Sequence, residues 1–257
     1  MMIIPTGMTA QEMTGGRDSL LTNFSFQVKL IGEFMSRLNG STSISESSNS
    51  VSRQIDLMSL FKKETYFSNK EYTEDFIQKV LERQTYIAYQ DSTWYAIAKC
   101  AAESAEKKDT EITLVLKTEE YGDGMYKWVI ADAWGEMLDL TPEKRNPGLK
   151  ISPVDNEVNF MSLSHITETE RKNILNYARH DYEPDRLTAL NALLYNGCIS
   201  IRYVKDLSYV FTDVAGYRLK INNYPGEGRN CGWLVSEIHP AVRKVDRKNI
   251  PSTLSIQ

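Results

Sequence analysis

Residues 110–138 read TEITLVLKTEEYGDGMYKWVIADAWGEML, two β-branched and aromatic-rich runs around a Gly-Asp-Gly tip. Glycines at such a tip supply the positive φ angles that a tight hairpin needs. In the first arm, Ile112, Leu114 and Leu116 point to one face of a strand, and the residues between them point to the other. This stretch therefore predicts a β-hairpin, which we expect at the centre of an antiparallel sheet covered by helices.

Length, composition and charge are those of an ordinary globular protein. A chain of 257 residues can bury a sizeable core in one large domain or two smaller ones. Its hydrophobic fraction of 41% and charged fraction of 25% argue against wholesale disorder. The net charge of −4 argues against a nucleic-acid partner, because binding to a phosphate backbone relies on clustered Lys and Arg. No segment is long and apolar enough to span a bilayer, so no membrane partner is predicted.

The cysteines and the first residues favour a reducing compartment. Cys100, Cys198 and Cys231 are too scattered for a disulfide framework or a Cys-x-x-Cys metal site, and we predict that they are inert thiols. The first residues lack the basic region and long apolar core of a signal peptide. We therefore expect a cytoplasmic protein.

Helical spacing of apolar residues dominates the chain before the hairpin. Ile31, Met35 and Leu38 continue a stripe begun by Phe24 and Val28, which predicts one face of a helix packed on the core. After these helices the apolar period changes to two, as in strands. The elements expected before the hairpin are a flexible leader at 1–17, a helix from Asp18 or Ser19 to about Leu38, a mobile serine-rich linker at 41–52, helices at Arg53–Phe61 and from Thr73 (burying Phe76, Ile77, Val80 and Leu81), and strands at Tyr86–Tyr89 and Thr93–Ala102.

Proline and glycine mark a boundary after the hairpin. Residues 141–153 are predicted to be a linker loop between a unit at 18–140 and a second unit at 154–239. Helices followed by strands in each unit predict an α+β fold rather than alternating βαβ units. The second unit is expected to contain a helix opened by Thr167-Glu-Thr-Glu170, a helix from Pro184 to Gly197 with Leu187, Leu190, Leu193 and Leu194 on one face, strands at Cys198–Val204, Ser208–Asp213, Tyr217–Asn222 and Gly232–Ile238, and then a solvated basic tail at 240–257.

The two units resemble each other in part. Tyr126-Lys-Trp-Val-Ile130 is similar to Cys231-Gly-Trp-Leu-Val235, and each unit runs through helices before strands. Duplication of one α+β unit explains this similarity, and so does the general preference of strands for Ile, Val, Tyr and Trp. Both interpretations stay open.

The order of helices before strands, the aromatic strands Trp94-Tyr-Ala-Ile-Ala-Lys99 and Tyr126-Lys-Trp-Val-Ile130, and the tight hairpin together resemble the nuclear transport factor 2-like superfamily. The resemblance covers Leu20–Leu138 at most and leaves the second half of the chain outside it. It implies a concave sheet closed by helices, which in some members holds a small molecule and in others mediates contacts. Enzymatic members place an Asp and a His inside the cone. The first half of this chain has no histidine, so no catalytic residue carries over.

The sequence contains no coherent catalytic or metal-binding set. His165, His180 and His239 lie in different predicted elements and form no HExxH, HxH or His-Cys pattern. The glycine-rich run at 225–232 precedes a strand and lacks the helix N-terminus that phosphate binding requires. We therefore predict no metal and no cofactor.

Asp132 is the one catalytic candidate. It shares a face of its predicted strand with Tyr126, Trp128 and Ile130. If that face lines a cone, a carboxyl group among aromatic rings is suited to general acid–base chemistry. The alternative is that the face carrying Ala133 is the core and that Asp132 is solvated.

Three functional hypotheses follow. The first is a non-enzymatic protein that binds a small molecule or an unknown protein partner through aromatic side chains. The second is an acid–base enzyme of isomerase or hydrolase type on the same cone, with Asp132 or a second-half histidine as the acid–base group. The third is a homodimeric structural component that pairs through the outer face of a bent sheet. The ligand-binding candidates of the first hypothesis are Tyr86, Tyr95, Tyr126, Trp128 and Trp134.

Overall fold

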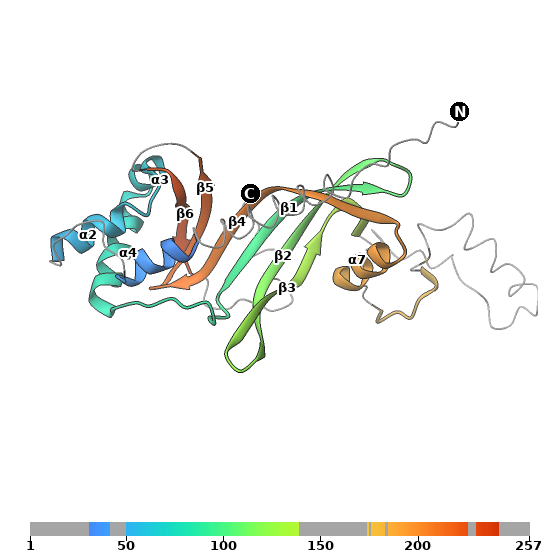
Figure 1. Ribbon diagram of the computed structural model, residues 1–257, viewed down its shortest axis with the longest axis horizontal. Coiled ribbons are helices and arrows are strands. Elements are labelled where there is room, and N and C mark those ends of the chain that lie inside the picture. The colour runs from blue at the N-terminus through green and yellow to red at the C-terminus, as the bar shows by residue number, and fades with distance from the viewer. Residues whose placement is uncertain are drawn as a thin grey trace, which may run out of the picture. The chain divides into compact units, whose positions relative to one another are not determined.

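The helices and strands of the chain form an α+β fold. The computed structural model (Figure 1) describes residues 31–41, 50–138, 174, 176–182, 185–225 and 230–241. In this part of the chain, one six-stranded antiparallel sheet accompanies a few helices. The predicted fold class is therefore confirmed at the level of α+β with an antiparallel sheet.

Helices precede strands in both halves of the chain, as predicted. The described helices are residues 31–39, α2 (Ser50–Met58), α3 (Lys63–Ser68), α4 (Lys70–Arg83) and α7 (Arg186–Tyr195), and η1 (Glu136–Leu138) is a short 3-10 helix. The strands are β1 (Trp94–Ser104), β2 (Asp109–Gly122), β3 (Met125–Trp134), β4 (Ile199–Val214), β5 (Tyr217–Tyr224) and β6 (Gly232–Pro240). Their order in the sheet is β3-β2-β1-β4-β5-β6.

The hairpin of residues 110–138 forms as predicted, but at one edge of the sheet. β2 ends at Gly122, β3 begins at Met125, and Gly124 in the tip has a φ of 78°. The expectation of a central hairpin is wrong, because β1 pairs with β2 on one side and with β4 on the other. β4 comes from the second half of the chain, and the alternation within the hairpin arms carries no information about so distant a neighbour.

The structure divides into two compact units, and each draws on both halves of the chain. Unit 1 takes its residues from Met1–Tyr95, Thr118–Lys127 and Ser208–Gln257, and unit 2 takes its residues from Ala96–Lys117 and Trp128–Leu207. The predicted division into 18–140 and 154–239 stays a prediction.

Several predicted segments lie wholly or mostly outside the described residues. They are the leader at 1–17, the linker at 141–153, the helix opened by Thr167 and the tail at 240–257.

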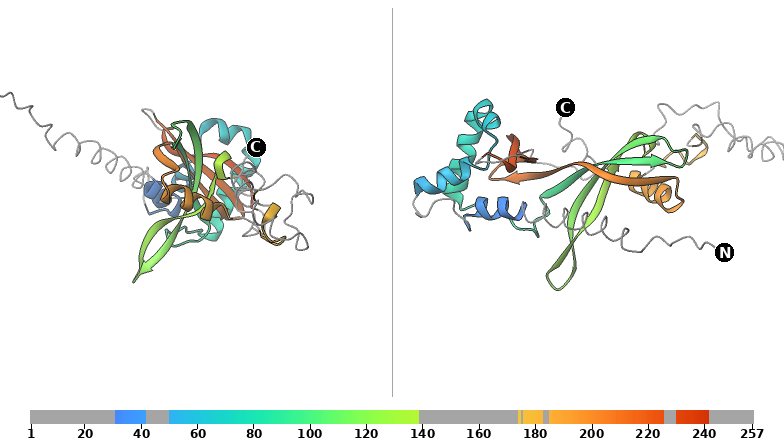
Figure 2. Two further views of the ribbon diagram at one scale, coloured as in Figure 1. Left: turned by 90° about the vertical axis from the view of Figure 1, so that its right-hand side faces the viewer. Right: turned by 45° about the horizontal axis from the view of Figure 1, so that its top comes forward.

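In unit 1, the helix at 31–39 and helices α2, α3 and α4 gather beside β5 and β6 (Figure 1, Figure 2). Ile31, Met35 and Leu38 are buried, which confirms the described part of the predicted apolar stripe. Phe34, one turn from Leu38, stacks on Phe211 of β4 with ring centroids 6.2 Å apart. The helix at 31–39 therefore packs against β4 with the face that the apolar spacing indicated.

An aromatic cluster forms the centre of the unit 1 core. The Trp94 ring stacks on Phe211 at 5.5 Å with an interplanar angle of 8° and contacts Tyr209 at 5.9 Å. Tyr209 in turn meets Trp233 edge-on at 4.8 Å. The Trp94 indole donates to the carbonyl oxygen of Tyr89 at 3.2 Å, so its one polar group is satisfied.

The predicted end of α2 and the predicted start of α4 both differ in the structure. α2 ends at Met58 rather than at Phe61, because the residues after it form a parallel bridge with β6. In that bridge, the amide of Val235 donates to the Leu60 carbonyl oxygen at 2.8 Å. α4 begins at Lys70, three residues before the predicted start at Thr73, and directly follows α3, which the apolar pattern did not indicate.

The predicted strand at Tyr86–Tyr89 is wrong. Its backbone groups bond to side chains instead of to a neighbouring strand: Asn39 both donates to and accepts from Ile87, at 2.7 and 2.8 Å. The amide of Ala88 donates to the carboxylate of Asp91 at 2.7 Å. These side-chain contacts replace a strand ladder, which local period-two spacing cannot foresee.

A buried tyrosine links α4 to β5 in unit 1. The Tyr217 hydroxyl donates to the Asp75 carboxylate, which also pairs with Lys79 at 2.6 Å. Burial, followed by the bond to Asp75, raises the pKa of Tyr217 to about 12. Hydrogen bonds from Lys79 and Tyr217 lower the pKa of Asp75.

The raised pKa of Tyr217 predicts a loss of stability in alkaline solution. A tyrosine in an unfolded chain has a pKa of about 10, so the folded state holds this proton more tightly. The stabilisation is complete below pH 10 and is lost as pH rises toward about 12. We expect Tyr217→Phe to flatten the decrease in unfolding free energy over this range, measured by urea denaturation at a series of pH values. Tyr195→Phe, at a side chain 92% exposed, should leave the decrease unchanged. An unchanged slope in Tyr217→Phe would contradict the assignment.

In unit 2, α7 packs on one face of the β1–β2 pair. The register places Cys100 opposite Ile112 and Ala98 opposite Leu114, and all four side chains are buried. Leu190 of α7 is fully buried against this cluster. α7 begins at Arg186 after the N-cap Asp185, two residues later than predicted, because the Asp185 carboxylate accepts from the Thr188 amide at 2.9 Å.

One long strand, β4, replaces the two strands predicted at Cys198–Val204 and Ser208–Asp213. Residues 200–206 are exposed throughout, so the strand continues through a stretch that has no buried face. Gly135, just after β3, allows a close approach: a Cβ atom there would lie 2.9 Å from the carbonyl oxygen of Glu111. This approach brings η1 against the β1–β2 pair.

Candidate functional site

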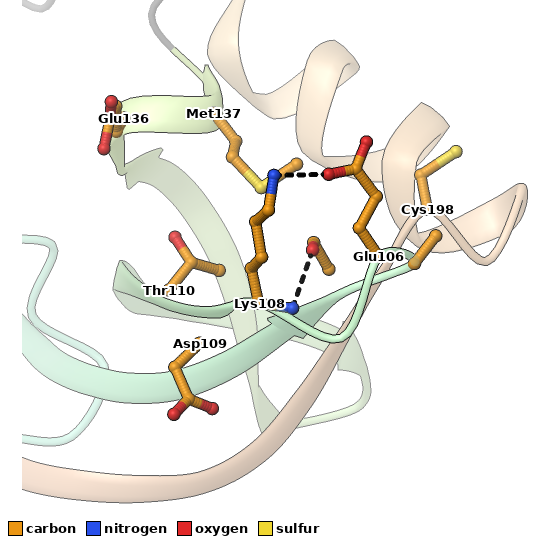
Figure 3. Close-up of a pocket in the computed structure, with 9 residues that line it drawn as sticks. Glu106, Lys108, Asp109, Thr110, Glu136, Met137 and Cys198 are labelled. Atoms are coloured by element: carbon orange, nitrogen blue, oxygen red, sulfur yellow. Dashed lines mark hydrogen bonds and ion pairs between the residues drawn. The ribbon is translucent and has the colours of Figure 1, made fainter.

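The candidate site is an open pocket in unit 2 (Figure 3). Its volume is about 520 Å³, and it is formed by the β1–β2 turn, η1 and the residue before β4. Its chemistry comes from charged groups, hydroxyl groups and one thioether. The lining residues used below are Ser104, Glu106, Lys108, Thr110, Glu136 and Met137, with Asp109 and Cys198 at the margin.

The β1–β2 turn holds Lys108 and Glu106 in place through its backbone. The Ser104 amide donates to the Lys108 carbonyl oxygen at 2.9 Å, and the Ser104 hydroxyl accepts from the Lys108 amide at 3.2 Å. Lys107 between them adopts a φ of 59°, the left-handed conformation of a tight turn. The Ala105 amide donates to the Cys198 carbonyl oxygen at 2.9 Å, which attaches the turn to the start of β4.

The opposite wall of the pocket is fixed by burial. Leu138 is fully buried in the unit 2 core, and its amide donates to the Gly135 carbonyl oxygen at 2.9 Å. This bond closes η1, so that Glu136 is exposed at the pocket and Met137 packs against the core cluster. The pocket therefore has an apolar thioether beside an exposed carboxylate.

An ion pair spans the β1–β2 turn. Lys108 Nζ lies 2.6 Å from Glu106 Oε2, and Figure 3 shows the two side chains reaching toward each other beside Met137. The hydrogen bond between them raises the pKa of Lys108 and lowers the pKa of Glu106. Asp109 points the other way in Figure 3. Both partners of the ion pair are thus held in their charged forms near neutral pH.

Asp132, the catalytic candidate, lies on β3 in unit 2 and outside the lining of this pocket. One of its carboxylate oxygens accepts from Arg186 of α7 at 3.0 Å, and the other accepts from the Ala133 amide at 2.8 Å. Its neighbour Ala133 is fully buried in the core cluster. In the structure, Asp132 therefore joins β3 to the start of α7.

The five aromatic candidates are not brought together at the pocket. Tyr86 is 69% exposed, whereas the other four are half-buried. None of the five lines this pocket, and they are divided between the units. Tyr86, Tyr95 and Tyr126 belong to unit 1, and Trp128 and Trp134 belong to unit 2.

The pocket residues were missed because they carry no motif. The turn Ser104–Thr110 reads SAEKKDT, a charged connection between two strands, and such connections are usually plain solvated turns. The one available signal was the mixture of acidic and basic residues directly beside a strand end. Glu136 and Cys198 join the pocket only through the pairing of distant segments.

Comparison with known proteins adds no relative. No known protein family, curated protein or solved structure matches this chain. Within the described ranges, no group of three or more His, Cys, Asp or Glu side chains is placed to hold a metal ion. In the same part of the chain, none of the helices combines the length and apolar character needed to cross a membrane.

Proposed function

We propose that this chain is a non-enzymatic binding protein whose unit 2 pocket takes a small molecule carrying a positive charge and a short apolar part. The observation that carries the proposal is the lining of the 520 Å³ pocket, which combines carboxylate residues with the Met137 thioether. Pockets of this size suit small molecules, and a few polar groups beside apolar surface fix their orientation.

The sign of the ligand charge follows from the lining. The lining contains three carboxylate residues, Glu106, Asp109 and Glu136, and one cation, Lys108, which pairs with Glu106. Asp109 points away from Lys108 (Figure 3), so Glu136 supplies the excess negative charge at the pocket. An ammonium group gains from that excess, whereas a carboxylate or phosphate is repelled. The Met137 thioether supplies a contact for the apolar part of the ligand.

The protonation states of the pocket support binding rather than catalysis. An amine that acts as a nucleophile or base needs a lowered pKa, and the pKa of Lys108 is raised. A carboxyl group that acts as a general acid needs a raised pKa, and the pKa of Glu106 is lowered. The same ion pair produces both shifts and leaves these groups suited to electrostatic attraction.

A titration with matched probes tests the proposal. We expect butylammonium and phenethylammonium to bind saturably, with butyrate and phenylacetate binding far more weakly, when each is followed by isothermal titration calorimetry. Glu136→Gln should weaken ammonium binding about two- to fivefold, the range for an exposed charge contact. Glu119→Gln removes the same charge from the β2–β3 hairpin and serves as the control. Equal binding of amines and acids, or equal effects of the two variants, would overturn the proposal.

The nuclear transport factor 2-like architecture and the cytoplasmic location belong to the same proposal. Helices α2, α3 and α4 precede strands β1, β2 and β3 in the order that the resemblance implies, which supports the proposed architecture.

A structural component that forms homodimers is the second candidate function. It is favoured by Ile201, Tyr203 and Val204, three apolar side chains exposed on β4. Light scattering over a range of protein concentrations distinguishes a dimer from a monomer.

A further inference from the structure

A second concave site lies on unit 1, among its helices. This helical groove is lined by Gln54 of α2, Tyr66 of α3, and Glu74, Ile77, Gln78 and Leu81 of α4, and its volume is about 320 Å³. The four α4 residues are spaced i, i+3, i+4 and i+7, so they form one continuous stripe along the helix. The groove therefore follows the axis of α4 over two turns.

Apolar surface continues from the groove on both flanks. Met58 is exposed one helical turn from Gln54, on the same side of α2. Phe67 is 64% exposed beside Tyr66, and the two rings meet edge-on at 5.4 Å. Within the groove, Ile77 is buried and Leu81 is exposed, although the sequence predicted that Leu81 is buried. An amphipathic helix normally turns such side chains inward, so their exposure on neighbouring helices marks an interaction surface.

Among the described residues that line the groove, the one charged residue is acidic. This residue is Glu74, and Gln78 donates to Glu82 at 2.8 Å one turn further along α4. Lys70 forms a long ion pair with Glu74 at 3.7 Å, and the Glu74 side chain is still 53% exposed. Arg53, next to Gln54 on α2, is engaged with the carbonyl oxygens of Arg37 and Leu38. An acidic lining repels phosphate backbones and anionic lipid headgroups and attracts basic side chains.

We infer that the helical groove docks an amphipathic helical segment of a partner protein, with apolar side chains on one face and basic side chains beside them. An apolar anchor of this segment enters between Ile77 and Leu81, and its neighbours along the same face cover Met58 and Phe67. A lysine or arginine beside the anchor pairs with Glu74. This surface belongs to unit 1 and is independent of the unit 2 pocket.

A designed peptide pair tests the docking of a basic amphipathic helix. The first peptide has eighteen residues, with Leu at i, i+3, i+4 and i+7 spacing and Lys elsewhere, and the second replaces each Lys with Glu. We expect saturable binding of the fluorescein-labelled Lys peptide to the full chain, at least tenfold tighter than the Glu peptide, by fluorescence anisotropy. Leu81→Asp should weaken binding of the Lys peptide at least tenfold, because the apolar contact that the peptide makes with Leu81 is lost. Glu74→Lys should weaken it about tenfold, since one attraction becomes a repulsion.

Two control variants separate docking from general attraction between a basic peptide and an acidic chain. Glu119→Lys changes the net charge as Glu74→Lys does, but it lies on β2 and does not line the groove. Tyr195→Asp introduces the same side chain as Leu81→Asp at a site on α7. Circular dichroism melts of all four variants confirm that each is folded. Equal weakening by Glu119→Lys and Glu74→Lys, or unchanged binding to folded Leu81→Asp, would overturn the inference.

Discussion

Replacement of Trp94 by alanine is expected to lower the free energy of unfolding by about 3–5 kcal/mol, the usual cost of deleting a large buried aromatic side chain. Trp94 is 1% exposed, and its ring contacts Phe211, Tyr209 and Tyr89. Alanine would leave a cavity at the centre of these rings and would remove the donor to the Tyr89 carbonyl oxygen. Urea denaturation followed by circular dichroism measures the change.

The control for this prediction is Tyr195→Ala, which also removes a large aromatic ring. The Tyr195 side chain is almost fully exposed, so its loss should change the free energy of unfolding by less than about 0.5 kcal/mol. Trp94→Phe should fall between the two, because a smaller ring keeps part of the stacking on Phe211. A cost below about 1 kcal/mol for Trp94→Ala would show that this aromatic cluster is not the core of unit 1.

Leu190→Ala is expected to cost about 2–5 kcal/mol, because it opens a cavity between α7 and the β1–β2 pair. Leu190 is fully buried and packs in one cluster with Cys100, Ile112 and Ile199. The same substitution should weaken any ligand binding at the unit 2 pocket, since the lining residue Met137 packs against this cluster. Urea denaturation of the full chain again supplies the measurement.

Asn191→Ala provides the matched comparison on α7. Asn191 is the next residue along the helix and is exposed, and alanine has the higher helix propensity. We therefore expect Asn191→Ala to be neutral or slightly stabilising. If Leu190→Ala and Asn191→Ala had the same effect, the packing of α7 on the sheet would be contradicted.

Local patterns predicted the elements whose side chains follow a single burial period. Ile31, Met35 and Leu38 are buried where their spacing indicated, and the β2–β3 hairpin turns at Gly122-Asp-Gly124. Patterns failed where the pairing partner lay far away in the chain. The parallel bridge of Phe61 with Val235 ends α2 early. The Asn39 side chain forms hydrogen bonds with the backbone of Ile87, where a neighbouring strand was expected.

The candidate site was less accessible to sequence reasoning than the fold. The aromatic residues predicted to bind a ligand belong to two different units, and their role stays a prediction. The pocket instead combines a turn at residues 104–110, the 3-10 helix at Glu136–Leu138 and Cys198. Each of these is an ordinary segment by itself, and none carries a spacing that a catalytic or metal motif requires.

Residue order alone was enough for the α+β class, the hairpin and the apolar face of the first helix, because steric preferences and alternating burial act over a few neighbouring positions. The edge position of that hairpin, the union of two expected strands into β4, and the meeting of Lys108, Glu136 and Cys198 arose only in the folded chain. Each of these depends on which distant segments pair and exclude water from one another. The pairing of distant segments depends on how much apolar surface the whole fold buries, so the sequence of one segment does not determine it.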